Sequence, residues 1–390
     1  MQSTKILRRS KTPLKPNSKH VNDKGIEIIH NGDRIYYKDD SRDIDKIITF
    51  NPETFLGWAS LLCYQGTVFE MKEVKFVLFT TGTLGFTVAL ITSRLPTFGS
   101  KDFDVTPLDN LIKFLLVFLA FMTGVFVNGA FARWQEILRQ MFLVVHNVKK
   151  LCTDLAMHSV DHEVLRDIRR WGLVSVWFVA LEAPATWEPP EWDEDLDDMQ
   201  EDDLLTNEER AELRGKTGKK AELVWVWISL KIRELSESGA VPARQTPAFV
   251  KMLDHIHEAT TAIHTIFNLI LFQVPHQYLH MLAFLIHLFS ILNTIKCGMR
   301  VGANLAANEH FTLNAMQGQT LFVDFLFMLL SPLIYSAFLA IASDITIPFG
   351  SGTTDIPIRF MLERFHTEFQ DMDDFMQNPV RGTVLSKQSS

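Results

Sequence analysis

Long apolar stretches alternate with strongly polar ones along this chain of 390 residues. An apolar helix of about 20 residues crosses the hydrocarbon core of a bilayer, which is roughly 30 Å thick. Four stretches approach or exceed this length, at residues 76–93, 114–132, 276–295 and 320–343. The first three contain no Asp, Glu, Lys or Arg, and the fourth contains only Asp324 near its start. The pattern predicts an all-α, multi-pass membrane protein with four transmembrane helices.

Four crossings would place both termini and residues 133–273 on one side of the membrane. Basic residues flank the predicted spans on that side: Lys72, Lys75, Arg133, Arg139, Lys149 and Lys150. The two loops on the opposite side are short and carry few basic residues. Positively charged loops stay on the cytosolic side of a membrane. We therefore expect the large region to lie in the cytosol or in an equivalent compartment such as a stroma.

The same-side region 133–273 is predicted to be helical. Residues 171–181 are apolar but too short to span, which indicates a buried helix. Residues 224–232 form an apolar-rich helical segment. In one further segment, apolar residues recur with a period near 3.6 residues, as in a helix: Phe249, Met252, Leu253, Ile256, Ala259 and Ile263. The acidic stretch 188–212 is expected to be a solvated loop, because like charges repel one another.

Composition narrows the functional classes. Net charge is −8, but the first 24 residues form a basic arm. This arm fits a solvated tail, an organellar transit segment or a contact with anionic lipid. Three cysteines, Cys63, Cys152 and Cys297, are too few for a disulfide framework. The chain has no Gly-rich phosphate loop, no Cys–His zinc pattern and no nucleophile motif. We therefore expect no cofactor, no catalytic residue and no nucleic-acid partner.

The second predicted span carries a stripe of apolar residues at helical spacing. Val117, Phe121 and Val125 follow one another at intervals of four and share one slowly drifting helix face. Taken alone, such a stripe favours a lipid-facing or packing surface. Small residues in the same span would permit close helix approach: Gly124, Gly129 and Ala130.

Five separate motifs resemble one membrane-protein family and occur in that family's order. They are FMTGVFVNGAFARWQE (121–136), LRDIRRWGLVSVWFVALE (165–182), the segment from LLTNEERAEL to VWVWISLKIRE (204–234), VPHQYLHML (274–282) and IPFGSGTTDIPI (347–358). Together they cover about residues 70–375 and are similar to the bestrophins. The last motif resembles bacterial and plant or algal thylakoid members more than animal ones.

This resemblance implies a homopentameric anion channel in the lipid bilayer, with a channel domain at 71–375, a basic arm at 1–70 and a tail at 376–390. Val117, Phe121 and Val125 match the family's pore neck, where only Phe121 keeps the usual aromatic character. A second constriction would fall at Ala248 and Phe249. Chloride is the expected ion and bicarbonate the runner-up, and a chloroplast thylakoid membrane is the favoured location, ahead of the plasma membrane or another organelle.

Calcium activation is not expected. Animal members carry a dense acidic run after Pro-Phe-Gly, whereas this chain offers Asp355 alone as a weak remnant. Calcium binds six to eight oxygens, usually with several carboxylates. Asp355 would serve equally well to cap the helix that follows.

Two other functions fit parts of the sequence. His276 and His280 are spaced for one helix face, as in a membrane-bound metalloenzyme, but the further His boxes of such enzymes are missing. Asp324 within the fourth span could be a coupling group of a secondary anion transporter, since intramembrane acids often mark ion paths. No internal repeat of the kind common in transporters is evident.

Overall fold

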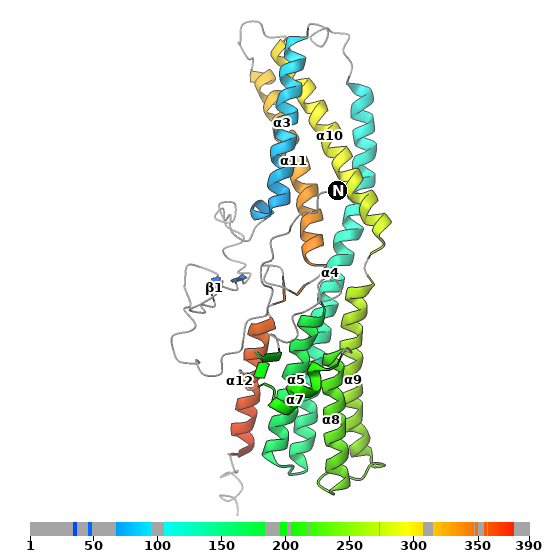
Figure 1. Ribbon diagram of the computed structural model, residues 1–390. Coiled ribbons are helices and arrows are strands. Elements are labelled where there is room, and N and C mark those ends of the chain that lie inside the picture. The colour runs from blue at the N-terminus through cyan, green and yellow to red at the C-terminus, as the bar shows by residue number, and fades with distance from the viewer. Residues whose placement is uncertain are drawn as a thin grey trace, which may run out of the picture. The chain divides into compact units, whose positions relative to one another are not determined.

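The computed structural model describes residues 34–36, 46–48, 68–95, 105–183, 196–197, 199–200, 204–216, 219–272, 274–306, 315–346, 348–349, 355–356 and 358–377. The chain divides into two compact units. The membrane unit consists of Phe50–Arg133 and Gln273–Thr346, and the extramembrane unit of Met1–Thr49, Trp134–Phe272 and Ile347–Ser390. One helix, α4 (Thr106–Met157), contributes to both (Figure 1).

Among the described residues, four helices have the length and apolarity to cross a membrane, as predicted. They are α3 (Lys72–Arg94), α4, α10 (His276–Ala306) and α11 (Ala315–Asp344). The sequence places the end of the second span at residue 132, but α4 continues without interruption to a length of 52 residues. The physical reason is local, because no Gly or Pro occurs between Ala130 and Met157 to break the helix.

In the membrane unit, α3, α10 and α11 pack against one another (Figure 1). The closest approach lies between α10 and α3. A Cβ added at Gly302 would lie 2.5 Å from the carbonyl oxygen of Ala89, and one at Gly298 would lie 2.8 Å from that of Gly85. These two glycines form a G-x-x-x-G pattern, which brings helix backbones together in membranes.

The close approach expected at Gly124 and Gly129 is not found among the described residues. A Cβ added at either position meets no atom within 4 Å. Ala130, by contrast, is buried. The helix-packing glycines of this unit are therefore on α3 and α10. Gly124 and Gly129 suggested a helix contact because they are small, and the described residues do not make that contact there.

The extramembrane unit is a second helical body with its own core. Its helices are α5 (His162–Glu182), α7 (Asn207–Arg214), α8 (Lys220–Glu237), α9 (Pro247–Leu271) and α12 (Ile358–Gln377). Helix α5 buries nearly all of its second half, including Trp177 and Phe178, which confirms the expected buried helix. The period predicted for α9 is also present, except that Leu253 is exposed.

The acidic stretch 188–212 is not a loop throughout, and this part of the prediction was wrong. Its last residues begin helix α7, where Thr206 and Glu209 form a reciprocal capping box. Glu209 also accepts hydrogen bonds from Arg170 and Trp171 of α5. Burial alone would raise the pKa of Glu209, but these hydrogen bonds outweigh it and lower the pKa. Specific pairing therefore overcomes the repulsion that predicted a loop.

A small amount of β-structure adds to the all-α fold. Strands β1 (Arg34–Tyr36) and β2 (Lys46–Ile48) pair in antiparallel fashion, with Ile35 opposite Ile47. Isoleucine and tyrosine favour extended backbone, which accounts for the pairing. A short 3₁₀ helix, η1 (Val68–Glu70), precedes α3.

One buried carboxyl group joins two helices of the extramembrane unit. Glu182, at the end of α5, accepts a hydrogen bond from the backbone N–H of Lys220 at 2.5 Å and from that of Ala221 at 3.4 Å. It therefore holds the first turn of α8. Burial raises the pKa of Glu182 from an ordinary 4.5 to about 7, although the two backbone hydrogen bonds act in the opposite direction.

We predict that Glu182 makes the protein more stable at pH 5 than at pH 8. A carboxyl group whose pKa is higher in the folded state stabilises that state below its unfolded pKa, and this advantage is lost as the pH rises towards 7. The shift corresponds to a loss on the order of 3 kcal/mol. The Glu182→Gln variant keeps a hydrogen-bond acceptor but does not titrate, so its melting temperature should fall less between pH 5 and pH 8. Equal pH dependence in both proteins would contradict the assignment.

Candidate functional site

The membrane part of α4 has one buried face and one exposed face. The buried face consists of Ile112, Leu119, Met122, Phe126 and Ala130. The side chains of the apolar stripe point the opposite way: Val117 is 74 % exposed, Phe121 69 % and Val125 51 %. The three residues named from the sequence thus lie together on the outward face of one helix.

Two asparagines lie on the line of this exposed stripe. Asn110 is two helical turns before Val117, and Asn128 is two turns after Phe121, so all four residues share one face. Both asparagines are exposed. An amide within the uncharged stretch 114–132 is costly against lipid, because hydrocarbon offers it no hydrogen-bond partner. The position of Asn128 therefore favours water over lipid on this face.

Sequence reasoning missed both asparagines, although the signal was available. The prediction used only apolar residues at intervals of four. Asn110 lies seven residues before Val117, and Asn128 lies seven residues after Phe121. Two turns of an α-helix contain about seven residues. Extending the stripe in both directions would have placed Asn110 and Asn128 on it.

A hydrogen bond fixes this part of α4 to α10. The hydroxyl of Tyr278 donates to the backbone carbonyl oxygen of Met122 at 2.8 Å. Met122 belongs to the buried face, so the bond helps to keep the opposite face turned outward. Tyr278 lies in the VPHQYLHML motif, and its contact gives that motif a structural role.

A charged network lies near the start of α4. The carboxylate of Asp109 is 3.1 Å from Lys296, 3.2 Å from Lys113 and 3.7 Å from Arg300. Arg300 is also 3.5 Å from Asp324. Asp324, considered from the sequence as a coupling group of a transporter, is thus buried beside a cation. The network joins α4, α10 and α11.

The two residues expected at a second constriction differ in exposure. Both belong to the first turn of α9, where Ala248 is half-buried and Phe249 is 5 % exposed within the core of the extramembrane unit. Phe249 would have to leave that core to line an opening. The neighbouring Val250 is 47 % exposed, and it is the apolar side chain of this turn that sequence reasoning overlooked.

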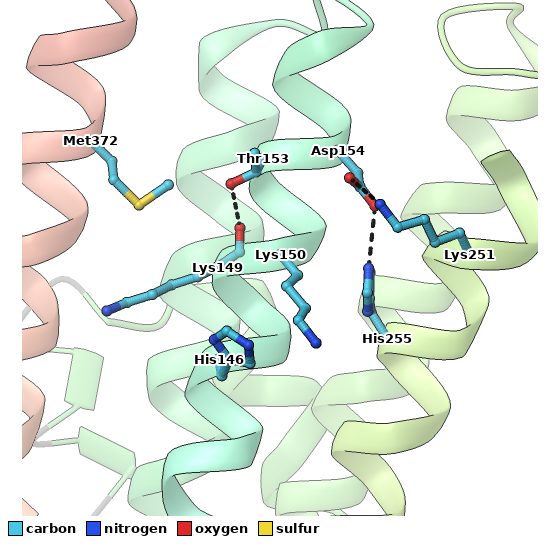
Figure 2. A pocket seen from close by; sticks show the side chains of 8 residues that line it. All are labelled: His146, Lys149, Lys150, Thr153, Asp154, Lys251, His255 and Met372. Atoms are coloured by element: carbon cyan, nitrogen blue, oxygen red, sulfur yellow. Dashed lines mark hydrogen bonds and ion pairs between the residues drawn. The ribbon is translucent and has the colours of Figure 1, made fainter.

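A basic pocket of about 430 Å³ lies in the extramembrane unit, between α4 and α9 (Figure 2). Asp154 lies within it, with Lys251 at 3.0 Å and His255 at 3.2 Å. Lys149 pairs instead with Glu368 of α12 and lies over the ring of Phe365. Lys150 adds a further positive charge to the lining. The ion pairs of the pocket join α4 to α9 and α12 within this unit.

The other predicted features are placed as follows. The rings of His276 and His280 lie 6.2 Å apart on α10. Within the described ranges, no three His, Cys, Asp or Glu residues converge as a metal site would require. Asp355 is half-buried, next to the hydrogen bond from Ile356 N–H to Pro348 O. Residues 350–354, on which the calcium prediction also depends, lie outside the described residues.

These features define an integral, multi-pass α-helical membrane protein with a helical extramembrane unit. Its α4 presents an apolar stripe flanked by amides. Residues 51–371 match the sequence model of a family described as "Bestrophin, RFP-TM, chloride channel". The chain belongs to the bestrophin family, which confirms the resemblance seen in its motifs.

Solved structures support the same fold. Two variants of a bacterial bestrophin homologue from Klebsiella pneumoniae align with TM-scores of 0.58 and 0.57, at 16 % and 17 % sequence identity. Each alignment covers 77 % of this chain, and 99 % and 98 % of the bacterial chains. No curated protein matches the chain. At this level of identity the structural likeness establishes the fold alone.

Proposed function

We propose that this protein is a homopentameric anion channel whose pore is lined by the exposed stripe of α4. The observation that carries the proposal is the exposed Asn128 within the uncharged stretch 114–132 of α4, on the same face as Val117, Phe121 and Val125. Such a face is suited to water rather than to lipid. A closed ring of identical copies would turn it inward. The number five rests on the family resemblance.

In this proposal, the three apolar residues form a hydrophobic neck. A narrow apolar collar can close by dewetting, without a solid plug. The positive edge of the Phe121 ring can face an anion that passes. No acidic residue lies between Phe114 and Ala132, so a cation finds no partner there. These properties favour a large, weakly hydrated anion over a small cation.

A second constriction is proposed at the first turn of α9. Ala248 and Val250 carry it, because both side chains reach the surface of the extramembrane unit. Phe249 would support the constriction without lining it, because its buried side chain anchors this turn in the core. The cap of the helix helps to fix the geometry, because the side chain of Thr246 accepts a hydrogen bond from Phe249 N–H.

The proposed ion is chloride, with bicarbonate as the runner-up, and gating does not strictly require calcium. Both anions are compatible with a neck that offers no specific ligand. The thylakoid membrane is proposed as the location on the Pro-Phe-Gly motif alone, and fractionation of the source cells would test it. A metalloenzyme or a secondary transporter has less support, because His276–His280 has no third partner within the described ranges and Asp324 faces Arg300.

Reconstitution of the purified protein in a planar bilayer tests this function. We expect the reversal potential to follow the chloride gradient, to shift when bicarbonate replaces chloride on one side, and to ignore a cation gradient. Currents should persist when calcium is chelated. Native mass spectrometry should give five copies per assembly. Absence of conductance, or a reversal potential set by cations, would overturn the proposal, and steep opening by calcium below about 10⁻⁵ M would overturn the calcium statement.

A further inference from the structure

Lys113 lies one turn before the neck, on the same side of α4. It precedes Val117 by four residues, which brings the two side chains close to one face. Its side chain is 70 % exposed. Apart from Lys113, no charged residue occurs on α4 between Asn110 and Ala132. The stripe therefore begins with a cation and continues through the apolar neck.

The network behind Lys113 leaves an excess of positive charge. Among the residues that the structure describes, three cations, Lys113, Lys296 and Arg300, share two carboxylates, those of Asp109 and Asp324. The carboxylate of Asp109 pairs with all three cations, and its side chain is 21 % exposed. It therefore orients Lys113 without fully neutralising it. The balance within this network is one positive charge per copy of the chain.

The position of Lys113 along α4 assigns it to one end of the pore. It lies twenty residues before Arg133, which is the last α4 residue of the membrane unit. A helix rises about 1.5 Å per residue, so the two positions are about 30 Å apart along its axis. This is close to the thickness of the hydrocarbon core. Lys113 thus marks the mouth of the pore that faces away from the positively flanked side of the membrane.

We propose that Lys113 of each copy contributes to an anion-binding ring at this mouth, which collects permeant anions before they reach the neck. The inference rests on the proposed function, because it requires the stripe of α4 to line a pore. A ring of five ammonium groups with low-dielectric walls raises the local concentration of anions. The same ring repels cations where the neck itself offers only weak discrimination.

A lysine at this depth could instead extend its ammonium group to lipid headgroups, as lysines near helix ends commonly do. The two roles differ in their consequences. A lysine that contacts lipid affects insertion or assembly and leaves the conductance of each open channel unchanged. A lysine at the mouth changes that conductance, and the change depends on salt concentration, because salt screens the ring.

Single-channel recording of Lys113→Gln, Lys113→Arg and Lys113→Glu tests the ring. At about 20 mM chloride, Lys113→Gln should lower the anion conductance by about threefold or more. Lys113→Glu should lower it further, and Lys113→Arg should preserve it. The differences should largely disappear at about 1 M salt, where the screening length falls to about 3 Å. Lys72→Gln, at the start of α3, serves as the matched control and should conduct like the parent protein.

Chemical modification identifies the side from which Lys113 is reached. A Lys113→Cys variant is made in a background without Cys63, and the two described cysteines, Cys152 and Cys297, are buried. A positively charged methanethiosulfonate reagent should restore conductance when it is added to one chamber only. A negatively charged reagent in the same chamber should lower it. Modification from the opposite chamber alone would contradict the proposed mouth.

The outcomes separate the two proposals. If the parent protein carries no anion current, the channel function itself fails. If the parent conducts but Lys113→Gln has the same conductance at low salt, the ring alone is wrong and the contact with lipid is favoured. Gel filtration of each variant shows whether the assembly is intact, and the Arg variant distinguishes loss of charge from loss of fold.

Discussion

Replacing Val117, Phe121 and Val125 together by alanine should increase the anion conductance of the reconstituted protein by on the order of tenfold. The substitutions remove the bulk of the collar and widen it, so that water and anions enter at a lower cost. A decrease of about 1.4 kcal/mol in the barrier is sufficient for this increase. Anion preference should persist, because no acidic residue is introduced. Macroscopic current per assembled pentamer, in symmetrical chloride, is the measurement.

Leu116→Ala provides the control for the neck. Leu116 is 40 % exposed, but helical spacing places it on a different face of α4 from Phe121. It should therefore leave the conductance unchanged. If the triple variant behaved like Leu116→Ala, the stripe would not line the pore, and a surface directed at lipid would explain its exposure.

Substituting Gly302 by alanine should prevent the normal packing of α10 on α3. The added Cβ would lie 2.5 Å from the carbonyl oxygen of Ala89 and 2.6 Å from Cβ of Thr92. Backbone cannot yield as a flexible side chain does, so the helices must separate. Overpacking of this kind costs about 1–3 kcal/mol. We expect a lower melting temperature in detergent and a smaller yield of monodisperse protein.

Gly318→Ala is the matched control for this substitution. Gly318 is also in a membrane-length helix, α11, but a Cβ there would meet no atom within 4 Å. Alanine also has the higher helix propensity, so this variant should be at least as stable as the parent. Equal loss of stability in both variants would show that glycine content, rather than the contact with Ala89, determines the effect.

The sequence was sufficient for the elements whose signal is local. Uninterrupted apolar runs identified the four membrane-length helices, and the 3.6-residue period of Phe249, Met252 and Ile256 identified the buried face of α9. The shared face of Val117, Phe121 and Val125 was also predicted and is exposed on α4, whereas its role as a pore neck stays a prediction. The resemblance of the five motifs gave the family.

Features that depend on distant partners could not be read in this way. Glu209 lies in an acidic stretch that predicts a loop, and only its contact with Arg170, far away in the sequence, explains the helix there. The positions of Gly298 and Gly302 became meaningful only once α3 was seen beside them. Likewise, the sequence did not show that the core of the extramembrane unit encloses Phe249.

The uninterrupted length of α4 has a consequence for how such a protein can evolve. Because α4 buries side chains on one face along the whole extramembrane unit, inserting or deleting one residue between Val145 and Leu151 would turn every later side chain by about 100° relative to the earlier ones. Leu151 and Leu155 would then turn away from the core in which Met141 and Val144 remain. Substitutions along α4 can therefore accumulate gradually, whereas changes in its length are tolerated only in steps that restore the helical phase.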